Sequence, residues 1–280
     1  MKLVHISDIH IHSEEILESE PVGMFAKVLA HIESHHLDAD KIVITGDLTH
    51  HGHQDDYKKL RKMIAASGLR GKLAPELLLG NHDNRDEFCR VFPESNRDSN
   101  GFVQSVEMTS VGLFVYLDTS EPGTHAGHFC HDRQEWLIRQ LIRARKTGQP
   151  VYIFMHHNPI LVHVHNSDRI GLVQMDAFQN ILAANNDVIR HIFFGHCHYS
   201  LSGCVRGVPF SAPRSTNHPC WPDLSGKEGR MGYGPFERNY NVCFLTPDST
   251  LVHSIDFERQ EDVLWHPTDE SGWIEEVSAA

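Results

Sequence analysis

The sequence lacks any long hydrophobic segment. No apolar run among its 280 residues approaches the ~20 residues that are needed to cross a bilayer. The apolar run that begins at Met1 and ends at His5 is also too short for a signal peptide. We therefore expect a protein without a membrane span.

Positive charge is scarce as well. The chain has 25 Lys and Arg against 37 Asp and Glu, which gives a formal net charge of −12 at pH 7. An acidic surface repels phosphate backbones and anionic lipid headgroups. Nucleic acid polymers and membrane surfaces are therefore disfavoured as partners.

Paired cysteine motifs are absent too. The six cysteines include no C-x-x-C spacing, and they are too sparse for a disulfide framework. This pattern favours reduced thiols and a cytoplasmic location. What the sequence has in abundance is histidine, with 23 residues, and histidine is the commonest metal ligand in proteins.

Short apolar runs alternate with segments of helical periodicity. The expected strands are residues 2–6, 41–45, 76–79, 113–117, 151–155 and 191–194. Continuous apolar strands between helices indicate sheets that are covered on both faces, and hence an α/β fold. Residues 241–255 predict an antiparallel hairpin. Residues 211–240 are rich in Pro, Gly and Ser and predict a long loop, of the kind that is often functional.

Polar side chains follow five of these strands, at the point where each strand ends. In α/β sheets, ligands bind at the carboxyl ends of the strands. Imidazole together with carboxylate suits Zn, Fe or Mn. Seven side chains suffice for two ions with four protein ligands each if one carboxylate is shared. The candidate metal ligands are Asp8, His10, Asp47, Asn81, His156, His196 and His198.

The order of these motifs resembles that of a known family. The order D-x-H, G-D, G-N-H-D, H-H and G-H-x-H over residues 1–200 resembles that of the calcineurin-like metallophosphoesterases. Within them it is most similar to the bacterial class III cyclic-nucleotide phosphodiesterases and their glycerophosphodiesterase relatives. The resemblance implies a four-layer α/β/β/α sandwich of two mixed sheets with helices on both outer faces, plus a C-terminal β-hairpin extension. Residues 1–200 would form the core. Residues 201–280 would complete the second sheet in the same domain and carry the substrate-side loop at about 211–240.

The resemblance also implies the assignment of ligands. One metal ion would be held by Asp8, His10, Asp47 and His198. The other would be held by Asp47, Asn81, His156 and His196. The ions would be Mn, Fe or Zn, and His82 would face the substrate phosphate. Protein Ser/Thr phosphatases of this superfamily carry Asp-Arg-Gly in the second motif, whereas residues 48–52 read Leu-Thr-His-His-Gly here, so that activity is not expected.

The predicted function is hydrolysis of small phosphodiesters, with cyclic nucleotides of the cAMP type first. A hydroxide bridging the two ions would attack phosphorus, and His82 in its protonated form would stabilise or protonate the leaving alkoxide. His157 and His218 are candidate substrate contacts. For His157, a role on the substrate side or in positioning a metal ligand and a packing role are equal alternatives.

Several alternatives remain open at this stage. A glycerophosphodiester or phospholipid head-group phosphodiesterase fits the same motifs. A metal-free interaction scaffold is the alternative that is not an enzyme. The roles of His50, His51 and His53 are open, and homo-oligomer formation through the C-terminal hairpin is implied by the resemblance alone.

Overall fold

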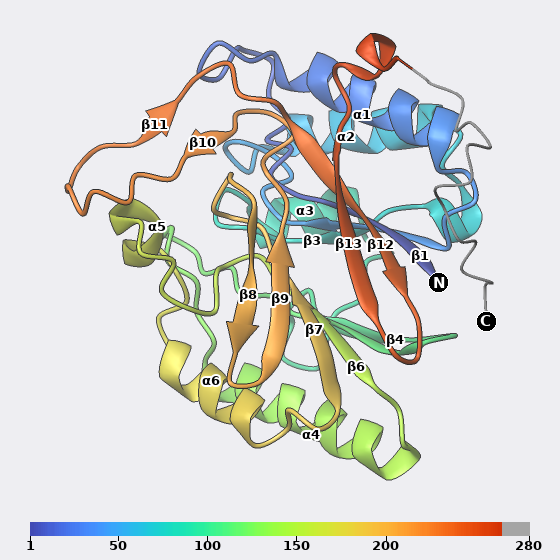
Figure 1. Cartoon of the computed structure of the whole chain (residues 1–280), viewed down its shortest axis with the longest axis vertical. Helices are drawn as coiled ribbons and strands as arrows, with labels where there is room; N and C mark the ends of the chain where they lie inside the picture. Colours follow the sequence, from blue (N-terminus) through green and yellow to red (C-terminus); the bar gives the residue numbers. More distant parts are fainter. Residues whose placement is uncertain (265–280) are drawn as a thin grey trace, which may run out of the picture.

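The computed structural model describes residues 1–264 of the chain. Two large β-sheets pack face to face at the centre of the molecule (Figure 1). The first sheet has five strands in the order β13-β12-β1-β2-β3; β1, β2 and β3 are parallel, and β12 and β13 form an antiparallel hairpin. The strands are β1 Lys2–Ile6, β2 Lys41–Thr45, β3 Glu76–Leu78, β12 Asn239–Leu245 and β13 Thr250–Asp256.

The second sheet has six strands in the order β4-β5-β6-β7-β9-β8. Strands β5, β6, β7 and β9 are parallel, while the edge strands β4 and β8 run antiparallel to their neighbours. Its strands are β4 Ser105–Thr109, β5 Gly112–Tyr116, β6 Val151–Phe154, β7 Ile189–Phe193, β8 Leu201–Val205 and β9 Val208–Ala212. A separate two-stranded ribbon consists of β10 (Cys220–Trp221) and β11 (Gly232–Tyr233).

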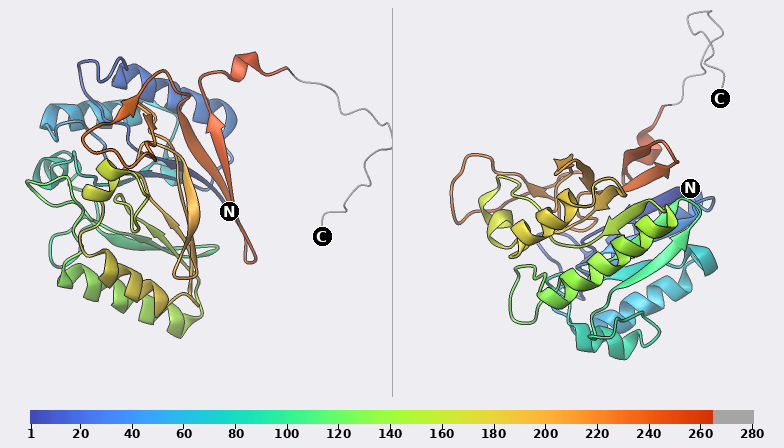
Figure 2. Two further views of the ribbon diagram at one scale, coloured as in Figure 1. Left: turned by 60° about the vertical axis from the view of Figure 1, so that its left-hand side comes forward. Right: turned by 90° about the horizontal axis from the view of Figure 1, so that it is seen from below.

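Helices cover the outer face of each sheet. Helices α1, α2 and α3 share a hydrophobic core with the first sheet, and α4 and α6 share one with the second. Figure 2 shows α4 and α6 on the same outer face. The α-helices are α1 Pro21–His35, α2 Gln54–Ala66, α3 Arg85–Val91, α4 His131–Thr147, α5 His165–Arg169 and α6 Met175–Ala183, with 3₁₀ turns at Gly71–Leu73 and Gln260–Asp262.

Residue spacing explains why these helices dock. In α1 the buried residues Phe25, Val28, Leu29 and Ile32 recur every three or four positions and form one apolar stripe. A third hydrophobic cluster lies between the sheets and includes Phe154, whose ring stacks on Phe193 at 4.9 Å between centroids. The predicted four-layer α/β/β/α arrangement is confirmed.

The C-terminal part is divided between the sheets, which corrects one prediction. We expected residues 201–280 to complete the second sheet. Strands β8 and β9 do so, but the hairpin of β12 and β13 pairs with β1 and extends the first sheet. Strand β12 is almost fully buried because it lies between β1 and β13. The predicted loop at 211–240 contains the β10–β11 ribbon, and residues 265–280 lie outside the described part.

This topology brings the ends of β1, β2, β3, β6 and β7 to one edge of the sandwich, where loops from both sheets meet. The loops after β1 and β2 are bonded to each other, since Asp8 N–H donates to Gly46 O at 3.2 Å and His10 N–H to Asp47 O at 2.8 Å. From the second sheet, His196 N–H donates to the Asp8 carboxylate at 3.1 Å. Among the described residues, no helix has the length and hydrophobicity that a membrane span requires.

Candidate metal centre

Four buried side chains form a first cluster at this edge: Asp8, His10, Asp47 and His198, whose potential ligand atoms lie within 4.8 Å of one another. His10 Nε2 lies 3.2 Å from His198 Nε2 and 3.5 Å from Asp47 Oδ2. His198 Nε2 lies 3.4 Å from Asp8 Oδ1. The four atoms converge as the ligands of one cation would.

A second cluster adjoins the first through Asp47. Its Oδ1 atom lies 3.4 Å from His156 Nε2, while its Oδ2 atom faces His10. Asn81 Oδ1 lies 3.0 Å from His156 Nε2 and 2.7 Å from His196 Nδ1. The structure therefore brings all seven predicted ligands together, with the Asp47 carboxylate between the two sets.

Hydrogen bonds on the far side of two imidazoles fix which nitrogen faces the centre. His156 Nδ1–H donates to Thr45 O at 2.7 Å, and His198 Nδ1–H donates to His218 O at 2.9 Å. In the neutral ring, each Nε2 then presents a lone pair toward a carboxylate. Lone pairs and carboxylate oxygens repel at these distances unless a proton or a cation lies between them.

The pKa values of His156 and His198 also show that the two clusters favour positive charge. Burial opposes the charged form of His156, but the Asp47 carboxylate outweighs it and raises the pKa of His156 to about 9. Burial also opposes the charged form of His198, and the Asp8 carboxylate raises its pKa to about 10. The clusters thus attract cations, and this set of imidazoles, carboxylates and one amide fits the Zn, Fe or Mn that we predicted.

Backbone geometry at the centre is unusual. Left-handed φ angles are uncommon outside glycine and cost free energy, so they persist where the surrounding structure enforces them. Glycine is needed beside them: a Cβ atom on Gly80 would lie 2.2 Å from Asp47 Oδ1. The predicted ligands with left-handed φ are Asp8 (55°), His10 (47°), Asp47 (48°), His196 (68°) and His198 (61°).

Asp83 is a positioning residue to which sequence reasoning gave no role. The carboxylate of this half-buried residue accepts hydrogen bonds from Leu48 N–H at 3.0 Å, Gly80 N–H at 2.9 Å and the Tyr57 hydroxyl at 2.9 Å. Asp83 therefore ties the loop that contains Asp47 to the loop that contains Asn81. Burial, with a contribution from Asp47, raises the pKa of Asp83 to about 6. The G-N-H-D motif contained the signal, since Asp83 is its last residue.

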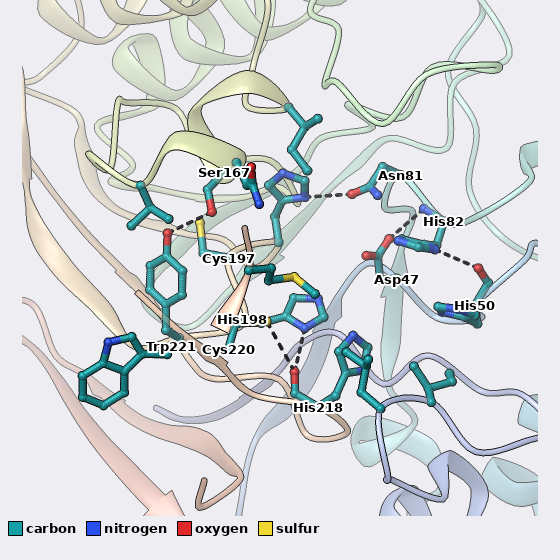
Figure 3. Close-up of a pocket in the computed structure, with 18 of the residues that line it drawn as sticks. Asp47, His50, Asn81, His82, Ser167, Cys197, His198, His218, Cys220 and Trp221 are labelled. Atoms are coloured by element: carbon teal, nitrogen blue, oxygen red, sulfur yellow. Dashed lines mark hydrogen bonds between the residues drawn. The ribbon is translucent and has the colours of Figure 1, made fainter. Parts of the chain in front are cut away.

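His82, the predicted catalytic residue, borders the centre. Its backbone N–H donates to Asp47 Oδ1 at 2.9 Å, and its ring Nδ1–H donates to His50 O at 2.8 Å (Figure 3). The other ring nitrogen, Nε2, is then available to exchange a proton. His125, which the sequence did not point to, lies 2.8 Å from the Asn81 amide nitrogen through its Nδ1.

The two candidate substrate contacts differ in position. His218 lines the cavity beside the first cluster. His157 is fully buried behind His156 and His196, with Nδ1 2.7 Å from Thr119 Oγ1, and it lines neither of the cavities at the centre. The substrate contact predicted for His157 stays a prediction, and a positioning or packing role fits its buried place.

Two cavities meet at Asn81 and His82. The first, of about 470 Å³, has an apolar wall that includes Ile16, Val164 and Trp221. The second cavity has a volume of about 510 Å³ and a more polar lining. Its lining includes Arg85, Glu121 and His125. His50 and His51 line both cavities, whereas His53 lines neither.

Two adjacent clusters of imidazole and carboxylate groups that share one carboxylate and open to a cavity could bind two metal ions, the arrangement that two-metal hydrolases use. Residues 1–200 match the calcineurin-like phosphoesterase family. The chain belongs to this family, whose members use two metal ions. The predicted resemblance and fold class are thus confirmed.

Similar proteins extend over nearly the whole chain. A probable cyclic nucleotide phosphodiesterase of Rhodopseudomonas palustris is 32% identical, over 92% of this chain and 93% of its own length. A cAMP/cGMP dual specificity phosphodiesterase of Mycobacterium tuberculosis is 30% identical, over 90% of this chain and 78% of its own. The predicted class, a metal-dependent phosphodiesterase, is supported by the family and by these names.

A solved structure of low sequence identity has the same fold. The crystal structure of a dimetal phosphatase from Danio rerio matches with a TM-score of 0.69 at 12% identity, over 92% of this chain and 96% of that one. At this identity the match bears on the fold alone.

Proposed function

We propose that this protein hydrolyses small phosphodiesters, with cyclic nucleotides of the cAMP type as the first candidates, at a centre of two metal ions. The observation that carries the proposal is the position of Asp47, whose two carboxylate oxygens face different ligand sets at the floor of a cavity. The cyclic nucleotide phosphodiesterase names of the two relatives support the substrate class.

The metal ions and the side chains around the centre have different roles in the proposed reaction. Bound metal ions would supply water activated near neutral pH and would neutralise charge on the phosphate. In its protonated form, His82 gives the proton on Nε2 to the leaving alkoxide and becomes neutral, because its Nδ1–H stays bonded to His50 O. His218 lines the same cavity and hydrogen-bonds a phosphate oxygen there.

The cavities also favour a second candidate substrate class. In a cyclic nucleotide both ester oxygens belong to one ribose, so the apolar cavity beside Trp221 can take the whole nucleoside. In an acyclic diester the phosphate carries two separate groups. The polar cavity with Glu121 and His125 offers room for the second group, as in a glycerophosphodiester with a cationic head group.

The test is a side-by-side assay of the purified protein after reconstitution with Mn²⁺. We expect two equivalents of metal per chain and turnover of 3′,5′-cyclic AMP above that of glycerophosphocholine and phospholipid. Asp47→Ala should abolish turnover, while the control Asp55→Ala, at a highly exposed side chain of α2, should keep it. Faster turnover of glycerophosphocholine would favour the second candidate. A metal-free, inactive, folded protein would favour the interaction scaffold.

Two broader expectations belong to the same proposal. A cytoplasmic location is supported by the six cysteines, all of which are free. Homo-oligomer formation through the hairpin of β12 and β13 is testable by light scattering, with a monomer mass as the contrary result.

A further inference from the structure

We propose that Asn217 positions His218 as a neutral hydrogen-bond donor, through a chain of hydrogen bonds that begins at Arg238 and passes through Ser19. The inference deepens the proposed function and rests on it for the role of His218. It assigns a positioning role to three residues that lie outside the metal ligands.

The turn that carries His218 is fixed to the metal centre. The hydroxyl of Ser215 donates to Asp8 O at 2.8 Å. Its oxygen accepts hydrogen bonds from Asn217 N–H at 3.0 Å and His218 N–H at 3.1 Å. In addition, His218 O accepts the Nδ1–H of the metal ligand His198 (Figure 3). The backbone of this turn therefore cannot move without moving two ligands.

The direction of the hydrogen-bond chain follows from its first member. Arginine can only donate: Arg238 Nε–H donates to Asn217 O, and Nη2–H donates to Ser19 Oγ at 3.2 Å. The Ser19 hydroxyl oxygen lies 2.8 Å from Asn217 O and 2.6 Å from Asn217 Oδ1. Because Asn217 O already accepts from Arg238, the single hydroxyl proton is assigned to the shorter contact, with Oδ1 as the acceptor. With its oxygen engaged by Ser19, the Asn217 amide turns its NH₂ group toward His218, 3.0 Å from Nδ1.

This order of donors sets the tautomer of His218. A ring that accepts a hydrogen bond at Nδ1 is neutral and carries its proton on Nε2. Among the described residues Nε2 has no hydrogen-bond partner, and the side chain lines the cavity. Its ring lies 4.6 Å from that of His10 and 4.4 Å from that of His198, between centroids. The chain thus presents an N–H donor beside the first cluster.

His82 has the opposite tautomer. Its Nδ1–H donates to a carbonyl, so a neutral His82 has a lone pair on Nε2. One histidine beside the centre is therefore fixed as a hydrogen-bond donor, and the other is free to exchange a proton. A tautomer change at His218 would place a lone pair against an anionic phosphate oxygen, which repels it.

The direct test is ¹⁵N NMR of histidine-labelled protein with Zn²⁺ bound, in which the His218 signals are those lost in His218→Ala. We expect the Nε2–H tautomer in the wild type and its loss or mixing in Asn217→Ala. The Nδ1–H tautomer in the wild type would overturn the inference. This readout does not require turnover, so its failure is distinct from a failure of the proposed function.

Kinetics gives the second test, with 3′,5′-cyclic AMP as substrate. We expect His218→Ala to lower kcat/KM about 10²-fold and Asn217→Ala to lower it about tenfold or more, with metal content unchanged. The double variant should equal His218→Ala, because Asn217 acts through His218. If the fold-losses in kcat/KM of the two single variants multiplied in the double variant, the inference would be overturned.

Two further variants guard against general damage to the fold. Ser19→Ala removes one link of the chain and leaves the turn intact, so it should lower kcat/KM less than Asn217→Ala does. It should add nothing to His218→Ala. Asn239→Ala removes another buried Asn, whose Oδ1 accepts from Arg214 N–H at 2.7 Å, and is the control for buried amide loss. A kcat/KM in Asn239→Ala as low as in Asn217→Ala would also contradict the inference.

Discussion

His5 and His191 should make the protein sensitive to acid, because both are buried between the sheets as neutral rings. His5 Nε2 lies 2.9 Å from Thr45 Oγ1, and His191 Nε2 lies 2.9 Å from Ser211 Oγ. The Nδ1 atom of each is buried and unpartnered among the described residues. Burial, with repulsion from His191, lowers the pKa of His5 to about 3, and burial lowers that of His191 to about 4.

The sign and size of the effect follow from these values. Below the ordinary histidine pKa of 6.5 the unfolded chain takes up protons that the folded chain refuses, so acid favours unfolding. The free energy of unfolding that the two neutral rings contribute is fully present above pH 6.5. It is lost as the pH falls toward the pKa values that His5 and His191 have in the folded protein. At about 1.4 kcal/mol for each pH unit, lowering the pH to 4.5 costs about 2.5 kcal/mol for each ring, or about 5 kcal/mol together.

Urea unfolding at pH 7.5 and pH 4.5, in the presence of chelator, measures this loss. His191→Phe keeps a ring against Phe193, which lies 4.3 Å away between centroids, but it cannot be protonated. The loss between the two pH values should shrink by about 2.5 kcal/mol in this variant. In His191→Phe the Ser211 hydroxyl loses its hydrogen-bond partner. This lowers the free energy of unfolding equally at both pH values, so it cancels in the difference between them. His253→Phe, at an exposed position of β13, is the control. An unchanged pH dependence in His191→Phe would refute the reasoning.

The metal centre supplies the remaining predictions. Asp47→Ala should lose both metal ions and all activity, and retention of two ions by mass spectrometry would contradict the shared carboxylate. His82→Ala should keep both ions but slow turnover about 10²–10⁴-fold, most for poor leaving groups; an unchanged rate with such a substrate would remove His82 from the mechanism. Asp83→Ala should weaken metal affinity about 10–100-fold in titrations, because two ligand loops lose their common acceptor. At pH 7, Mn²⁺ should release protons into weakly buffered solution, since the pKa values of His156 and His198 are about 9 and about 10 in the metal-free centre. Its affinity should therefore fall as the pH falls, and binding without proton release would argue against these values.

The parallel strands β1, β2, β3, β5, β6 and β7 were predictable because their runs of side chains are mostly apolar on both faces. Strands β1 and β2 begin and end where the sequence places them, at residues 2–6 and 41–45. The edge strands β4 and β8 were missed for a physical reason. A strand with only one neighbour can expose its side chains, and Ser202, Gly203 and Cys204 are exposed in β8. Neither strand has the continuous apolar pattern that identified β1 and β2.

The candidate ligands were predictable because the type of side chain and its place after a strand are both visible in the sequence. Which nitrogen of each histidine faces the centre was not visible. That depends on acceptors far away in the chain, such as Thr45 O for His156 and His218 O for His198. The burial of His157 depends in the same way on the packing of the loop that contains Thr119.

The sequence by itself determined the strands that the candidate ligands follow, the order of those strand ends and the seven side chains that could bind metal, because periodicity and residue type are local properties of the chain. Only the tertiary structure decided that Asp47 faces both clusters and that the C-terminal hairpin joins the first sheet. It alone also linked Asn217 to Ser19. These are contacts between residues far apart in the chain, and their geometry is fixed by how the layers pack rather than by any local pattern.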